Sequence, residues 1–131
     1  MTSDEIKTLR NDPDGLLSYE YLANHMGQSS PDEIDAVIEN MIAVDMSGQF
    51  LASAARYLHA IDPAGFAEPV RRLVAATIDK DREHRYLPDL LTGLYGEDCV
   101  ADARRLSASD DNFRRIYKRL YPASDSFKTK K

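Results

Sequence analysis

The chain has 131 residues, of which 43% are hydrophobic and 30% charged, and its formal net charge is −5. This length and composition are typical of one globular domain with its own core, and they exclude a disordered or low-complexity chain. The single cysteine, Cys99, excludes an intramolecular disulfide and a cysteine metal cage.

The first residues, MTSDEIKT, lack the basic and apolar regions of a secretory signal. No stretch of the chain approaches the roughly 18 consecutive apolar residues of a membrane-spanning helix. We therefore expect a cytoplasmic protein that makes no contact with a membrane.

Helical signals begin at the N-terminus. A short helix is expected over residues 4–10, with Ser3 as its cap. The turn Asp12-Pro13-Asp14-Gly15 then leads into a second helix, LLSYEYLANHM, which ends at Gly27.

The segment Ser30-Pro31-Asp32-Glu33 is the clearest helix start in the chain. It combines a serine cap, a proline at the first helical position and a glutamate that closes a capping box. Asp32, Asp35 and Glu39 fall within an arc of about 60° on one side of this helix. The opposite side carries the apolar residues Ile34, Val37, Ile38, Met41 and Ile42. The pattern predicts a helix with a buried apolar side and an exposed acidic side.

The next two helices follow turn signals. Asp45 or Ser47 is expected to cap a helix that starts near Gly48 and buries Phe50, Leu51, Ala54, Ala55 and Leu58. Asp62-Pro63 repeats the start signal, and Pro69 marks a kink or a fresh first turn. The apolar stripe after it consists of Val70, Leu73, Val74, Thr77 and Ile78.

Three shorter helices are expected at about 87–95, 97–106 and 109–121, the last with Ser109 as its cap. The closing run ASDSFKTKK has lost helical periodicity. We therefore expect one helical domain over residues 1–121 and a flexible tail over residues 122–131.

No segment alternates as a strand would, so the predicted class is all-α, a compact bundle of about six to seven short helices. The short sequence motifs that recur within the chain do so at inconsistent spacings. Asp12-Pro13 and Asp62-Pro63 are 50 positions apart, whereas Arg56-Tyr57-Leu58 and Arg85-Tyr86-Leu87 are 29 apart. The differing offsets favour an irregular bundle over HEAT-like stacked helical hairpins, which stay open as an alternative.

No catalytic or ligand-binding motif stands out. His25, His59 and His84 lack the three- or four-residue spacing of a helical metal pair. Asp32, Asp35 and Glu39 have helical spacing rather than the alternating pattern of a calcium loop. We expect no enzymatic activity, no metal and no cofactor.

The last helix has a basic face of Arg114, Arg115, Lys118 and Arg119. Such a face can contact phosphate, but the acidic balance of the whole chain argues against a nucleic-acid partner.

The charges are unevenly distributed along the chain. Between Arg10 and Arg56 there is no lysine or arginine, yet this window holds eight acidic residues. Residues 1–50 carry ten acids and two bases, whereas residues 51–131 carry twelve acids and fifteen bases. A surface of one sign steers a partner of the opposite sign, although solubility alone would also explain it.

Part of the acidic window is explained by helix capping, at Asp14, Asp32, Glu33 and Asp45. A predicted partner-binding face remains, and a basic protein would be its partner. Tyr19 and Tyr21 are candidate aromatic anchors for that partner. The charged residues of the face are Glu20, Asp32, Asp35 and Glu39.

With its acidic helices around Leu16–Asp45 and the hairpin rhythm of DREHRYLPDLLTGLYGED followed by SASDDNFRRIYKRLYP, the chain resembles cytoplasmic immunity proteins of bacterial contact-dependent inhibition and other polymorphic toxin systems. The resemblance implies stoichiometric binding. We expect the chain to be a monomer or weak dimer. Its acidic face would occupy the basic cleft of a nuclease-type toxin. The alternative is an adaptor that binds a peptide or helix in an apolar groove near Tyr86, Leu90 and Tyr95.

Overall fold

The computed structural model describes residues 2–122 of the chain. Within that range the chain forms eight α-helices and one 3-10 helix and contains no strand, so the predicted all-α class is confirmed. The helices are α1 (Ser3–Arg10), α2 (Leu16–Asn24), α3 (Pro31–Val44), α4 (Gln49–Ile61), α5 (Ala67–Lys80), α6 (Leu87–Tyr95), η1 (Cys99–Asp102), α7 (Ala103–Ser109) and α8 (Asp111–Leu120). Apart from Pro122, the predicted tail lies outside the described residues.

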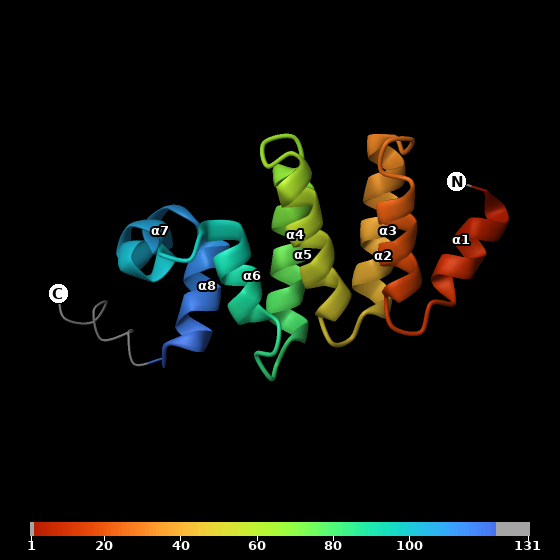
Figure 1. Cartoon of the computed structure of the whole chain (residues 1–131). Helices are drawn as coiled ribbons and strands as arrows, with labels where there is room; N and C mark the ends of the chain where they lie inside the picture. Colours follow the sequence, from red (N-terminus) through yellow and green to blue (C-terminus); the bar gives the residue numbers. More distant parts are fainter. Residues whose placement is uncertain (1, 123–131) are drawn as a thin grey trace.

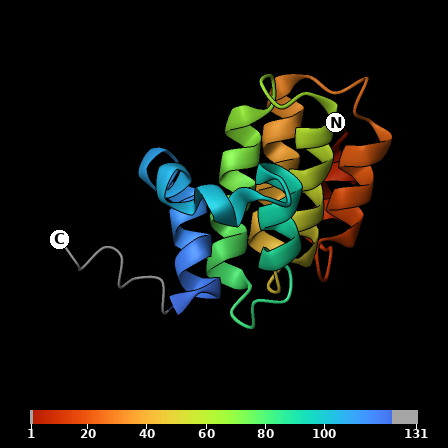
Figure 2. The same ribbon diagram turned by 60° about the vertical axis from the view of Figure 1, so that its left-hand side comes forward.

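The helices are stacked in pairs from one end of the molecule to the other (Figure 1). Helix α2 packs against α3, α4 against α5, and α6 against α8. Neighbouring pairs meet through two layers, one formed by α2, α4 and α6 and the other by α3, α5 and α8, with α1 beside α3 (Figure 2). This order is the stacked-hairpin alternative rather than an irregular bundle.

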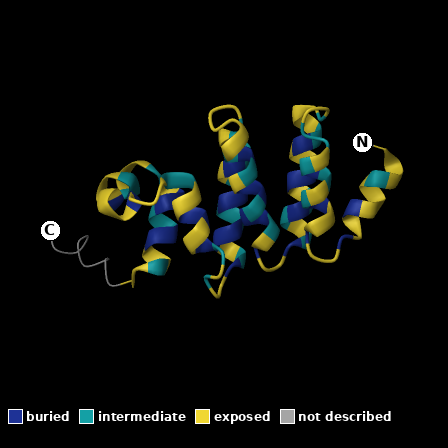
Figure 3. Cartoon of the chain, in the orientation of Figure 1, coloured by how far each residue is buried: buried dark blue, intermediate teal, exposed yellow. Residues whose placement is uncertain are grey.

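A continuous apolar core lies between the two layers. Figure 3 shows the buried residues along the facing sides of the paired helices. Each large apolar side chain that is fully buried stabilises the fold by about 1.5–3 kcal/mol. Those that are less than 2% exposed include Leu22, Ile38, Met41, Leu51, Leu58, Leu73, Leu87, Leu90, Phe113 and Ile116.

Each of the three helical pairs starts at a buried aspartate: Asp12, Asp45 and Asp81 are 4%, 1% and 2% exposed. Each carboxylate accepts hydrogen bonds from backbone N–H groups of the loop and helix that follow it. In all three cases the residue six positions later donates, at 2.9 Å from Ser18, 3.0 Å from Leu51 and 2.9 Å from Leu87. The aspartates therefore satisfy N–H groups at the starts of α2, α4 and α6, which would otherwise be buried without partners.

A second feature repeats with these aspartates. The third residue after each one has a positive φ, 104° at Gly15, 90° at Gly48 and 58° at His84. A Cβ atom on Gly15 would lie 3.0 Å from Cβ of Asp45, and one on Gly48 would lie 3.4 Å from Cβ of Asp81. The first two loops thus each pack on the aspartate of the next loop.

The aspartates stand 33 and 36 positions apart, a spacing typical of two-helix repeats. The offsets of 50 and 29 found in the sequence do not correspond to this repeat. Asp62-Pro63 lies at the opposite ends of the helices, in the turn between α4 and α5.

Local predictions were confirmed in part. Asp45 does cap α4, and Pro69 lies in the first turn of α5. The predicted cap of the last helix was wrong, because Asp110 accepts from the backbone N–H of Phe113 at 3.0 Å whereas the Ser109 hydroxyl donates to backbone carbonyls of α7.

The first cap was also wrong, since the hydroxyl of Thr2 accepts from the backbone N–H of Glu5 in a capping box. Ser3 is already the first residue of α1. The helix expected at 97–106 is η1 followed by α7, an insertion between the paired helices α6 and α8. No helix of residues 2–122 has the length and apolar composition that crossing a bilayer requires.

Candidate functional site

The acidic side of α3 is exposed as the sequence pattern predicts. The capping box at its start is complete, with the Glu33 N–H donating to the Ser30 hydroxyl and the Ser30 N–H donating to the Glu33 carboxylate, both at 3.2 Å. This start fixes the phase of the helix, so that its apolar stripe faces the core. Asp32, Asp35 and Glu39 consequently lie on the solvent side. We call these three residues the α3 acidic face.

The α3 acidic face has a counter-ion that the linear sequence does not suggest. Arg72 on α5 donates to Asp35 at 2.7 Å and to Glu39 at 2.5 Å. The Asp35 and Glu39 side chains nevertheless remain 54% and 64% exposed. Exposed ion pairs of this kind stabilise a fold by about 0–1 kcal/mol. The two carboxylates are therefore bridged in the free protein but stay accessible to another cation.

Glu20, the fourth predicted charge of the binding face, does not join this group. It is exposed on α2, which belongs to the layer of α2, α4 and α6, whereas α3 belongs to the other layer. The predicted face is therefore divided between the two layers of the molecule.

The two predicted tyrosine anchors are engaged within the protein. The ring of Tyr19 lies 6.3 Å from Phe50 and 6.3 Å from Tyr57, so it packs between α2 and α4. The ring of Tyr21 stacks on His25 with 4.0 Å between centroids. Burial raises the pKa of the Tyr21 hydroxyl, and the nearby carboxylates of Glu5 and Glu33 raise it further. Tyr19 has a clear structural role in joining the first two helical pairs.

Two acids of the base-free window are not surface charges at all. Asp12 and Asp45 are the buried capping residues of the loops before α2 and α4. Burial opposes ionisation of Asp12, but hydrogen bonds from the N–H groups of Ser18 and Gly15 outweigh it and hold its pKa below the usual value.

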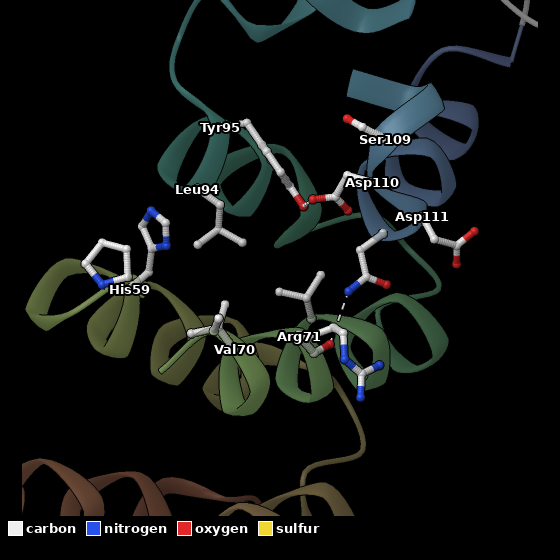
Figure 4. A pocket seen from close by; sticks show the side chains of 12 residues that line it. His59, Val70, Arg71, Leu94, Tyr95, Ser109, Asp110 and Asp111 are labelled. Carbon is white, nitrogen blue, oxygen red and sulfur yellow. Dashed lines mark hydrogen bonds between the residues drawn. The ribbon is translucent and has the colours of Figure 1, made fainter. Parts of the chain in front are cut away.

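A second candidate site is a cavity of about 430 Å³ between the α4–α5 and α6–α8 pairs (Figure 4). Val70, Val74 and Leu94 give it apolar walls. On one side the Tyr95 hydroxyl donates to Oδ2 of Asp110 at 2.9 Å. Burial and the neighbouring Asp110 carboxylate raise the pKa of Tyr95. An apolar cavity with a few polar groups at its rim is a common form of ligand or peptide site.

This cavity differs from the groove expected near α6. Tyr95 does line it, together with His59 of α4 (Figure 4). Leu90 is fully buried in the core, and Tyr86 precedes the first residue of α6, at the other end of the helix from Tyr95. The three residues therefore do not form one groove.

The remaining reactive side chains are dispersed. Among residues 2–122 no cluster of three or more histidine, cysteine or acidic side chains is arranged to hold a metal ion. His25 ends α2, with Nδ1 at 2.9 Å from the Tyr21 carbonyl oxygen, and His59 and His84 lie on other elements. Cys99 is 3% exposed, and burial raises the pKa of its thiol.

No protein-family model matches the chain, and no curated protein or solved structure matches it either. Its function is therefore inferred from the chemistry of its own surface. The α3 acidic face is the one predicted group that the fold gathers on a single exposed surface.

Arg72 is the residue of this site that sequence reasoning missed. It stands 33 positions after Glu39, the same distance that separates Asp12 from Asp45. Recognition of the repeat would have aligned α3 with α5 as neighbours in one layer and indicated this ion pair.

Proposed function

We propose that this chain is a non-enzymatic immunity protein of the cytoplasm, which neutralises a basic toxin domain by binding it through the α3 acidic face. The supporting observation is the exposure of three carboxylates on one helix face. Among the described residues, Asp35 and Glu39 share Arg72 as their ion-pair partner, and Asp32 is in no ion pair.

The contact with Arg72 indicates how a partner could be held. Its guanidinium bridges two carboxylates that stand one helical turn apart on a packed helix. An arginine or lysine of a toxin can take the same position, and Asp32 adds a further negative charge nearby. A basic cleft covered in this way would be closed to its nucleic-acid substrate. Opposite charges would also accelerate association.

The test begins with a toxin domain encoded immediately upstream of the gene for this chain, co-expressed with the full chain. Asp32→Lys, Asp35→Lys and Glu39→Lys are combined in one variant. The control combines Asp89→Lys, Glu97→Lys and Asp98→Lys, which changes the net charge equally at exposed positions near the other end of the chain.

The α3 variant should associate with the toxin domain at least about 10-fold more slowly and lose most of its salt dependence. The control should keep most of the rate of the unaltered chain. Equal rates for both variants would contradict the proposed face, and failure of the unaltered chain to protect cells from the toxin would contradict the immunity function.

The cavity at Tyr95 supports a second candidate function, a non-enzymatic adaptor that binds a peptide or helix. Its apolar walls favour an apolar side chain of the partner. Binding of this type would depend little on salt. It would be lost on Leu94→Asp, which places a charge in the cavity wall, and retained in the α3 lysine variant.

A further inference from the structure

A second, polar cavity of about 330 Å³ lies on the other side of α5 from the α3 acidic face. It is formed by the end of α5, the loop between α5 and α6, and the C-terminal half of α8. The residues that line it are Ile78, Asp79, Asp81, Arg82, His84 and Arg119.

The acids of this cavity are already engaged. Asp79 pairs with Arg115 at 3.2 Å. The carboxylate of buried Asp81 accepts three backbone N–H groups at 2.7–2.9 Å, those of Arg85, Tyr86 and Leu87. Among residues 2–122 neither carboxylate forms an ion pair with Arg82 or Arg119.

The two arginines of the cavity are not neutralised in the same way. Among residues 2–122 neither Arg82 nor Arg119 forms an ion pair, and the guanidinium of Arg119 donates one hydrogen bond, at 3.1 Å, to the Arg115 carbonyl oxygen. Both side chains belong to exposed residues. With the Asp79–Arg115 pair counted as neutral, two arginines stand against the one carboxylate of Asp81, so the cavity has a net charge of +1 and several guanidinium N–H donors.

His84 completes the cavity in an unusual conformation. It is the one non-glycine residue with a positive φ in the described part of the chain, and the equivalent positions of the other two loops hold Gly15 and Gly48. A side chain in this region of backbone space costs free energy that glycine avoids. Non-glycine residues held in such a conformation cluster at functional sites. Here the side chain adds an imidazole to the two arginines.

We propose that Arg82, His84 and Arg119 bind a phosphate monoester, either as free phosphate or as the phosphoryl group of a larger molecule. Two guanidinium groups and an imidazole provide N–H donors suited to a dianionic oxyanion. The cavity can hold one phosphoryl group together with a small part of the molecule that carries it. This site goes beyond the proposed immunity function and does not depend on it.

The first experiment uses the three histidines as reporters in the full chain. Imidazole NMR signals are followed while inorganic phosphate, phosphoserine or dimethyl phosphate replaces chloride at constant ionic strength. The His84 signal should shift and saturate with phosphate and phosphoserine, while His25 and His59 shift little. Dimethyl phosphate, a monoanion, should bind at least about 10-fold more weakly.

Tighter binding of phosphoserine than of phosphate would assign the site to a phosphorylated larger molecule, and the reverse would assign it to free phosphate. Absence of saturation, or equal shifts at all three histidines, would overturn the proposal.

The second experiment uses variants and calorimetry with phosphoserine. Arg82→Gln with Arg119→Gln should weaken binding at least about 10-fold. The control, Lys7→Gln with Arg10→Gln, removes the same charge from α1 and should leave the affinity within about twofold.

His84→Gly separates function from folding. Glycine relieves the backbone strain, so we expect the Tm to rise by a few degrees, roughly 3 °C, while phosphoserine binding weakens several-fold. A merely structural histidine would give unchanged binding in this variant, and that result would overturn the role of His84.

Discussion

Aspartates in two regions of this molecule have opposite environments. The loops before α2, α4 and α6 lie at one edge of the molecule, which we call the loop edge. There Asp12, Asp45 and Asp81 are buried and accept hydrogen bonds from backbone N–H groups, whereas Asp32 and Asp35 on the α3 acidic face are exposed. The residue type and the formal charge are the same. Burial of a charged group is tolerated at the loop edge because several N–H dipoles replace water around each carboxylate. The comparison teaches that acidic residues can be counted toward a binding surface only after their backbone partners are known.

Removal of a carboxylate should show the difference most strongly. Asp45→Ala leaves the N–H groups of Ser47, Gly48, Phe50 and Leu51 without their acceptor. We expect the free energy of unfolding to fall by about 3 kcal/mol, since buried unsatisfied N–H groups are costly. Asp32→Ala should cost less than about 0.5 kcal/mol. Urea denaturation of both variants measures the contrast, and equal losses would show that the loop edge and the α3 face are not distinct.

The loop edge also depends on close packing between successive loops. Gly15 has φ 104°, and a Cβ atom there would lie 3.0 Å from Cβ of Asp45. Gly15→Ala should therefore lower the free energy of unfolding by about 2 kcal/mol, through the left-handed backbone and the close contact together. Gly96 is a matched control, because it also has a positive φ, 96°, but a Cβ atom there would meet nothing within 4 Å. If Gly96→Ala cost as much in thermal denaturation, the stacking of loops would not be the cause.

Protonation of an aspartate at the loop edge should lower the free energy of unfolding by less than removal of its carboxylate does, because a protonated carboxyl keeps one oxygen as an acceptor. The pKa of Asp12 is held below the unfolded value of 3.8 by backbone N–H groups. Its contribution to stability is therefore complete above about pH 5 and is lost as the pH falls through the lowered folded-state pKa. The difference in unfolding free energy between the unaltered chain and Asp12→Asn should shrink below about pH 4. A difference that stays constant from pH 7 to pH 3 would disprove this linkage.

The regions also differ in how far the sequence could predict them. The start, phase and exposed side of α3 follow from Ser30, Pro31 and Glu33, because a capping box and an apolar stripe are local features. Burial of Asp45 beneath α4 could be predicted in part, as a cap. The Arg72 bridge does not follow from any local pattern, since it joins residues 33 and 37 positions apart on neighbouring helices, and only recognition of the repeat would have indicated it.

The repeat was hidden for a physical reason. Its marker is an aspartate followed three positions later by a residue with positive φ, and glycine at Gly15 and Gly48 fits that pattern. In the third loop His84 adopts the same backbone conformation without being glycine, so the repeat does not appear there as matching residue types. Tyr19 was interpreted as a partner contact because a single helix does not reveal that another pair, through Phe50 and Tyr57, covers it.

The smallest effect on stability is expected at the α3 acidic face itself. Arg72→Gln removes the bridge between Asp35 and Glu39, and because those carboxylates are more than half exposed the loss should stay below about 0.5 kcal/mol. The same change leaves both carboxylates without their internal cation, so association with a basic toxin domain should become about two- to threefold faster at low salt. Stopped-flow mixing measures this rate, with Arg71→Gln as the control, since Arg71 pairs with Glu68 instead. A slower rate in Arg72→Gln would mean that the arginine organises the face for its partner rather than competing with it. Only the competing role is consistent with a partner cation that takes the place of Arg72.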